Sequence, residues 1–337
     1  MHIGRGYTLA EFLDWTRRRI YLLALLAAVP VILYQALGMK WIAIPWVVVA
    51  LLGTAASFIV GFKNSQTYGR TLEAQQVWTA IAATSRYWGL IARDFPTDRT
   101  KTQPLVYRHL AWLTALRYQL RRERIWETAA SAPNTEYQER KAFKIPERET
   151  ALDDELRKYL PDGERERLAV SWDKATRIIA QQSTELRSLF GAQELVVLHH
   201  TEMQKTLKDL IDQQSRAERI KNFPYPRQYA VINRIFVWSF AALLPFGVVA
   251  EFDRLNAHVG GVLAGHMAWL AIPFSVLLAW LYVALDQVGE STENPFEGAA
   301  NDVPIAQICR LLEIELRDML GETALPRLLQ PQGNVIL

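Results

Sequence analysis

The chain has little of what catalysis and covalent cross-linking require. Cys309 is the only cysteine in 337 residues, so an intrachain disulfide cannot form and a cysteine-based zinc site is excluded. The sequence contains no phosphate-binding loop, no glycine-rich dinucleotide turn and no Gly-x-Ser-x-Gly elbow. A serine nucleophile with base partners cannot be picked out either. We therefore expect neither an enzyme nor a bound cofactor.

The charge balance is also modest, because 38 lysines and arginines face 35 acidic residues, for a net charge of +3. This does not by itself indicate a nucleic-acid partner. Half of the residues are hydrophobic and gather near both ends, while the charges gather in the middle. Many of the eleven tryptophans lie next to apolar runs, as aromatic residues at a membrane interface do. The distribution favours a membrane protein over two soluble domains.

Four apolar runs each approach the ~20 residues that cross a bilayer as a helix. They are Ile20–Leu37, Trp41–Phe62, Ala230–Val249 and Val262–Leu285. Buried core helices of a soluble protein are the weaker interpretation, because four such runs rarely coincide in one. The first run follows three arginines, as a signal peptide would. It is nevertheless long, lacks a clean cleavage site and is soon followed by the second run, so we interpret it as a span.

The breaks and basic residues around the runs give an orientation. Only Gly38–Lys40 separates the first two runs, which predicts a tight helical hairpin, with Pro30 and Pro45 tolerated inside membrane helices. Basic residues lie at the other ends of the runs, namely Arg5, Arg17, Arg18, Arg19, Lys63, Arg70, Arg227 and Arg234. The positive-inside rule places these ends and both termini in the cytoplasm. The loops Gly38–Lys40 and Ala250–Gly261 are then external.

The central region is too long and too periodic to be a loop. Helical spacing extends from Leu72 to Ile91 and recurs in Leu105–Arg124, Leu168–Phe190 and Ala192–Ile220, whereas Ser131–Thr150 is typical of a loop. No convincing strand alternation is present. We predict an all-α membrane protein whose four spans continue into a cytoplasmic helical bundle. Its segments are spans 1 and 2 (1–62), a cytoplasmic region (63–228), spans 3 and 4 (229–285) and a C-terminal cytoplasmic segment (286–337).

Three groups of polar residues could bind a metal, but each has a simpler interpretation. His199 and His200 precede Glu202, yet adjacent helical residues point about 100° apart and do not readily chelate one ion. Surface or pore-lining histidines are the better interpretation. Carboxylates at Glu290, Glu293, Glu297 and Asp302 surround an Asn-Pro-Phe element, but Gly298–Ala300 interrupts them. Glu313, Glu315 and Asp318 lie on a predicted helix, where Arg310 and Arg317 are spaced to pair with Glu313. We therefore predict no metal site.

Thr54, Phe58 and Phe62 recur every fourth residue along the second run, so they share one helical face. Such a stripe either packs against another helix or lines a pore, and the spacing alone leaves both open. Three longer segments bear on the choice. They are Ser57–Asn64 with Ser65, Tyr68, Arg70, Glu73, Ala74 and Trp78; Glu218–Pro226 with Tyr229, Arg234 and Leu244–Gly247; and Glu293–Phe296 with Asn301–Pro304, Ile308–Arg310, Glu313, Ile314 and Leu320–Glu322. In order and spacing they resemble the bacterial branch of the bestrophin family, nearly along the whole chain.

The resemblance implies a homopentamer in a bacterial inner membrane, in which five copies of the second helix surround one axial pore. Thr54, Phe58 and Phe62 match the hydrophobic neck of the family. An apolar residue usually stands where this chain has Thr54, so the outer end of the neck should be wetter. A narrow apolar collar resists hydration and gates by dewetting. Aromatic edges favour anions and faces favour cations, so ring orientation bears on selectivity.

Two further features follow from the resemblance. A second constriction of the family falls near Leu198, with Val197 and Thr201 as neighbours. Animal members also carry a calcium clasp just after the Asn-Pro-Phe element, where only Asp302 keeps a carboxylate in this chain. Calcium activation is therefore not expected.

The leading hypothesis is a passive channel for small monovalent ions, either chloride and other anions or sodium and potassium. Its partners would be four further copies of itself, the permeant ions and the lipid bilayer, with no nucleic acid. The alternative is a membrane-anchored helical scaffold or sensor without ion conduction, because about half of the chain is charged and cytoplasmic. An active transporter is less favoured, since no half of the chain mirrors the other.

Overall fold

The computed structural model describes residues 1–261 and 264–337, and the chain forms two compact units. The membrane unit comprises Gly6–Gly69 and Pro224–Glu293. The charged unit comprises Met1–Arg5, Arg70–Phe223 and Asn294–Leu337. Each unit has its own hydrophobic core.

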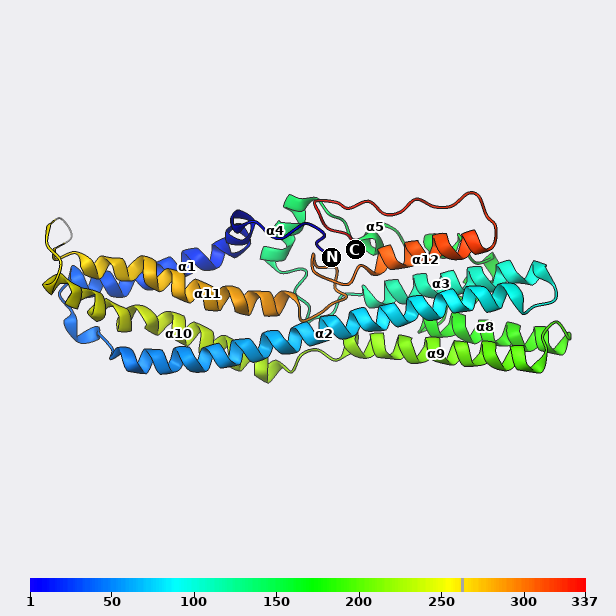
Figure 1. Cartoon of the computed structure of the whole chain (residues 1–337), viewed down its shortest axis with the longest axis horizontal. Coiled ribbons are helices and arrows are strands. Elements are labelled where there is room, and N and C mark those ends of the chain that lie inside the picture. The colour runs from blue at the N-terminus through cyan, green and yellow to red at the C-terminus, as the bar shows by residue number, and fades with distance from the viewer. Residues whose placement is uncertain (262–263) are drawn as a thin grey trace. The chain divides into compact units, whose positions relative to one another are not determined.

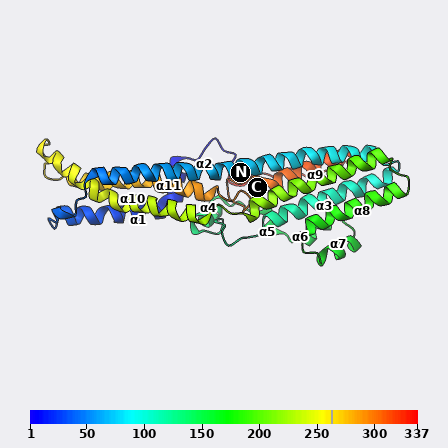
Figure 2. The ribbon, with the colours of Figure 1, turned by 90° about the horizontal axis from the view of Figure 1, so that it is seen from below.

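Four helices that run alongside one another build the membrane unit (Figure 1, Figure 2). They are α1 (Leu9–Gln35), the first part of α2 (Trp46–Asp94), α10 (Arg227–Arg254) and α11 (Ala271–Ser291). Among the described residues, the short 3₁₀ helices η1 (Lys40–Ile42), η3 (Leu255–Ala257) and η5 (Met267–Leu270) lie in the connections. Within the described residues four helices are long and apolar enough to cross a membrane, which confirms the four predicted spans. Val262, the predicted start of the fourth span, lies outside the described residues.

The beginning of α1 and the connection to α2 differ from the predicted boundaries. Helix α1 begins at Leu9 because Thr8 and Glu11 form a capping box, each side chain accepting the backbone N–H of the other residue. The predicted tight hairpin is wrong, because no helix covers 36–39 or 43–45 and Gly38 turns the chain at φ +66°. Pro45 precedes α2 instead of lying inside it, a position where its missing N–H costs nothing.

Helix α2 does not end where the sequence becomes polar. It continues without interruption through Lys63–Ser65 to Asp94, so its 49 residues extend over about 74 Å. That is more than twice the ~30 Å thickness of a bilayer core. The prediction that the second span continues beyond the apolar run is confirmed.

The charged unit is helical as predicted. It contains the second part of α2 together with η2 (Arg99–Lys101), α3 (Thr102–Leu120), α4 (Ala132–Lys141), α5 (Pro146–Glu149), α6 (Leu152–Leu156), α7 (Asp162–Ala169), α8 (Lys174–Gly191), α9 (Val197–Asn222) and α12 (Ile305–Met319). Its core buries Trp78, Trp88 and Trp112 completely or nearly so. In the part of the chain that the structure describes, β pairing is limited to isolated bridges.

Some local predictions for this unit need correction, and one is confirmed. Ser131–Thr150 is not a plain loop, because it contains α4 and α5. Pro133 and Pro146 misled the prediction: each lies in the first turn of its helix, where no intrahelical N–H is needed. The predicted pairing on α12 is confirmed, since Glu313 lies 3.5 Å from Arg310 and 3.3 Å from Arg317.

Candidate functional site

The predicted stripe of Thr54, Phe58 and Phe62 lies on a face of α2 that its own chain leaves uncovered. Phe58 is 79% exposed, Phe62 is 58% exposed, and Thr54 is exposed as well. The opposite face of the helix packs into the core of the membrane unit through Val49 and Val60. Two large aromatic side chains that the single chain leaves uncovered must face something else in the membrane. This is lipid, a second copy of the chain or the path of an ion.

Small and polar residues surround the two phenylalanines. The Thr54 hydroxyl donates to the Ala50 carbonyl at 3.0 Å, so only its lone pairs remain free to face outward. Ser57 and Gly61 are exposed beside the aromatic side chains, and a Cβ added to Gly61 would meet nothing within 4 Å. Faces that contain small residues allow another membrane helix to approach closely.

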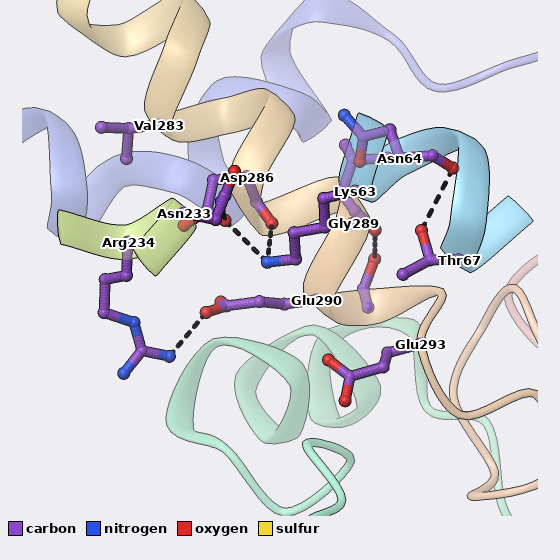
Figure 3. A network of polar contacts seen from close by, with 12 residues as sticks. Lys63, Asn64, Thr67, Asn233, Arg234, Val283, Asp286, Gly289, Glu290 and Glu293 are labelled. Atoms are coloured by element: carbon purple, nitrogen blue, oxygen red, sulfur yellow. Dashed lines mark hydrogen bonds and ion pairs between the residues drawn. The ribbon is translucent and has the colours of Figure 1, made fainter. Parts of the chain in front are cut away.

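Directly after Phe62, the Lys63 side chain enters the interior of the membrane unit, where only 2% of it remains exposed (Figure 3). Its Nζ lies 2.7 Å from Oδ1 of the buried Asp286 on α11. Asn233 on α10 donates an N–H to the same oxygen. A buried ion pair is stable only when its geometry is good and further hydrogen bonds complete it. This group therefore ties α2 to α10 and α11 one residue beyond the stripe.

Two further ion pairs, both formed by Glu290, lie close to the buried pair of Lys63 and Asp286. Glu290 accepts from Arg234 on α10 at 2.8 Å (Figure 3). It also accepts from Arg19 on α1 at 2.7 Å, so it connects α11 to both helices. Gly289 permits the close approach of α11 to α2, because a Cβ there would lie 2.5 Å from Oδ1 of Asn64. The Lys63, Asn233 and Asp286 group was missed from the sequence, where Lys63 was counted only as a basic flank. Polar residues at the ends of apolar runs were the available signal.

The predicted lower constriction lies at the beginning of α9, in the charged unit. Leu198 is 77% exposed, and Val197 and Thr201 are exposed on the same first turns of the helix. The Thr201 hydroxyl donates to the Val197 carbonyl at 2.8 Å, so the side chain lies along the helix. These residues thus form an uncovered apolar patch in the single chain, as Phe58 and Phe62 do.

The two histidines beside Leu198 are occupied by aromatic contacts. His199 stacks on Phe95 with ring centroids 3.9 Å apart, and His200 stacks on Phe190 at 4.8 Å. These contacts come from separate segments and direct the two rings to different neighbours. Among the described residues, no group of three or more histidine, cysteine, aspartate or glutamate side chains is arranged to hold a metal ion.

Asp302, which the resemblance aligned with a carboxylate of the calcium clasp, faces a guanidinium group. Its Oδ2 accepts the Gly298 N–H at 2.7 Å and lies 3.3 Å from Nη1 of Arg121. The other side of Arg121 faces Glu147, whose carboxylate is 3.5 Å from Nε. All three charged side chains are almost completely buried. Arg121 therefore supplies the positive charge that Asp302 needs in the interior.

The loop does not fit a calcium ion. Calcium takes six to eight oxygen ligands, whereas Glu297 is engaged by the Thr128 N–H at 2.8 Å and its hydroxyl at 3.0 Å, and Asp302 is engaged as above. Burial raises the pKa of both carboxyl groups, and Arg121 opposes this rise at Asp302. Arg121 is the counter-charge that the structure places beside Asp302.

Calcium is accordingly expected to leave the protein unchanged. Adding millimolar calcium, or removing it with a chelator, should shift neither the thermal unfolding midpoint nor any ion current. Replacing Arg121→Gln should destabilise the charged unit by about 3–5 kcal/mol, because Asp302 would stay buried without its guanidinium partner and Glu147 would keep only Arg117, at 3.3 Å. Arg122→Gln, an exposed neighbour, is the matched control. A calcium-dependent midpoint in the unmodified protein would contradict this assignment.

Comparison with known proteins gives a consistent set of similarities. The family model of the bacterial and fungal bestrophin proteins matches residues 15–318. The voltage-dependent anion channel-forming protein YneE of Salmonella typhi is 26% identical over 311 residues, covering 91% of this chain and 86% of the relative. YneE of Escherichia coli K12 is 24% identical over 301 residues, covering 89% and 84%. The crystal structure of a bacterial bestrophin homolog from Klebsiella pneumoniae superposes with a TM-score of 0.74 at 24% identity, covering 91% of this chain and 98% of that one.

Proposed function

This chain belongs to the bacterial and fungal bestrophin family, and on that premise we propose that it is a passive channel for small monovalent ions. The observation that carries the proposal is the uncovered pair Phe58 and Phe62 on a membrane-spanning helix. The relatives named as anion channel-forming proteins support the same function. Phe58, Phe62 and Thr54 form the neck of the pore, and its apolar rings oppose hydration of the path.

The channel is a homopentamer, in which α2 from each of five copies lines the axis. Two properties of α2 support this arrangement. Its uncovered face carries the neck residues, and Ser57 and Gly61 beside them leave room for a neighbouring helix. One copy leaves that face open, so the path exists only in the assembly.

The protein lies in a bacterial inner membrane with both termini in the cytoplasm. Basic residues at one end of the spans support this orientation through the positive-inside rule. Segments 63–228 and 286–337 are then cytoplasmic, and 1–62 and 229–285 carry the spans. The ion pairs of Arg19 and Arg234 with Glu290 lie at the cytoplasmic ends of their helices.

Leu198, with Val197 and Thr201, forms a second constriction on the cytoplasmic side. Its uncovered side chain supports this role. We expect Leu198→Ala to widen the limit on ion size, so that larger organic ions pass better relative to chloride or potassium. Bi-ionic reversal potentials measure this ratio. Phe190→Ala, which removes a side chain stacked on His200, is the control for loosened packing. Identical permeability ratios in Leu198→Ala and the unmodified channel would place the constriction elsewhere.

The function itself is tested in a planar bilayer that contains the purified protein. A KCl gradient is applied and the reversal potential is measured, after which cations and anions are exchanged in turn. A reversal near the chloride potential identifies an anion channel, and one near the potassium potential identifies a cation channel. Absence of current from folded protein, even after the neck phenylalanines are removed, would overturn the proposal in favour of a membrane-anchored scaffold.

A further inference from the structure

The charged unit contains a polar cavity of about 280 Å³, and its lining includes none of the residues of the proposed neck and second constriction. It is lined by side chains from α3, α7 and α8, which lie together in Figure 2. The charged and amide side chains that line it are Arg108, Glu164, Arg167, Arg177, Gln181 and Glu185. Three of these six residues are arginines. A cavity of this size accommodates a small metabolite, and its lining determines the kind.

One side of the cavity is a fixed and neutral network. The buried Arg108 donates to both Glu164 oxygens at 3.0 and 2.7 Å, and to Oε1 of Gln182 at 2.9 Å. Gln182 in turn donates to the Leu105 carbonyl at 2.7 Å. The Arg108 guanidinium holds the pKa of Glu164 below its usual value, so the pair remains ionised. This wall is built in advance and cancels its own charge.

The remaining groups are not satisfied by the protein. Arg167 and Arg177 are exposed, and within the described ranges neither forms an ion pair. Both amide atoms of Gln181, Oε1 and Nε2, are buried without a hydrogen-bond partner. A buried amide without partners is unfavourable, and the polar groups of a ligand would supply the missing hydrogen bonds. Arg177, Gln181 and Glu185 are spaced four residues apart on α8, so they present one face to the cavity.

We propose that this cavity binds a compact metabolite that carries a phosphate or carboxylate group and at least one hydroxyl or ammonium donor. Arg167 and Arg177 bind the anionic group, because guanidinium forks match carboxylate and phosphate oxygens. The Gln181 amide donates to the same group through Nε2. Oε1 of Gln181 and the Glu185 carboxylate accept hydrogen bonds from the hydroxyl or ammonium group of the ligand. The negative charge of Glu185 also disfavours ligands that carry a second anionic group.

The test is calorimetric binding to the purified full-length protein in phosphate-free buffer. The probes are glycerol 3-phosphate, inorganic phosphate, serine and glycerol. We expect saturable binding of glycerol 3-phosphate or serine, which distinguishes the phosphate from the carboxylate source, weaker binding of inorganic phosphate, and none of glycerol. Arg167→Gln and Arg177→Gln should each weaken binding at least tenfold.

Arg187→Gln is the matched control, because Arg187 is an exposed arginine on α8 outside the cavity lining. It should bind the probes like the unmodified protein. Gln181→Leu should weaken binding without loss of thermal stability, since it removes an amide that has no partner. Equal weakening in Arg187→Gln would show unspecific attraction by surface charge and overturn the site. Absence of binding at millimolar probe concentrations would overturn it as well. Neither result depends on whether the protein conducts ions.

Discussion

Replacing Phe58 and Phe62 together by alanine is expected to raise the conductance severalfold, or to open a channel that is closed at rest. Both side chains are uncovered in the single chain, so their removal leaves the core of the membrane unit intact. In the proposed pentamer the substitution removes ten aromatic rings from the narrowest apolar part of the pore. Each ~1.4 kcal/mol taken from the barrier to hydration and ion passage corresponds to about a tenfold change in rate. Single-channel recording in a planar bilayer measures the effect.

Phe274→Ala is the matched control for this double variant. Phe274 is also an exposed phenylalanine on a spanning helix. It lies on α11, outside the α2 face of Phe58 and Phe62, and its ring contacts Phe252. Its replacement should leave the conductance unchanged. Thr54→Leu should act in the opposite direction to the neck double variant, because it restores an apolar ring at the outer end. Unchanged currents in a folded Phe58 and Phe62 double variant would show that the neck lies elsewhere.

Much of this architecture could be predicted because it depends on local pattern. The apolar runs gave the four spans, and the spacing of Thr54, Phe58 and Phe62 gave a common face. The uncovered state of that face in one copy agrees with the spacing argument. Its assignment to a pore came from resemblance, since spacing alone cannot separate a pore face from a packing face.

The contacts between distant segments could not be predicted in the same way. Lys63 and Asp286 are 223 residues apart, and Arg121 and Asp302 are 181 residues apart. No periodicity connects such pairs, so Lys63 was taken for a basic flank and Asp302 for the remainder of a calcium site. The loop prediction around Pro133 and Pro146 failed for a different reason. Proline breaks a helix when it lies in the helix interior, but it is favoured in the first turn of a helix. Composition alone does not show which of these positions a proline occupies.

Replacing Lys63→Met or Asp286→Leu alone is expected to destabilise the membrane unit by about 3–5 kcal/mol, because each change leaves the partner charge buried without its nearest counter-ion. After Lys63→Met, Asp286 keeps only the longer pair with Arg19 at 3.9 Å. Both side chains are almost completely buried, and their ionised atoms lie 2.7 Å apart. The double variant should recover most of this loss, since an apolar pair of similar volume is often as stable as a buried ion pair. Glu251→Ala is the control, because its pair with Arg254 is exposed and worth at most about 1 kcal/mol. Thermal unfolding of the four proteins in detergent gives the double-mutant cycle.

The double variant also separates a stabilising role from a positioning role. Lys63 follows Phe62 directly, so the ion pair fixes the rotation of α2 where the neck ends. An apolar contact between methionine and leucine lacks the directionality of the ion pair and of the Asn233 hydrogen bond to Asp286. We therefore expect the double variant to be stable yet to show a higher open probability or a changed conductance. If it were stable and conducted like the unmodified channel, the network would hold the helices together without setting the position of Phe62. The uncovered face of α2 would then be oriented by its apolar packing alone, through Val49 and Val60.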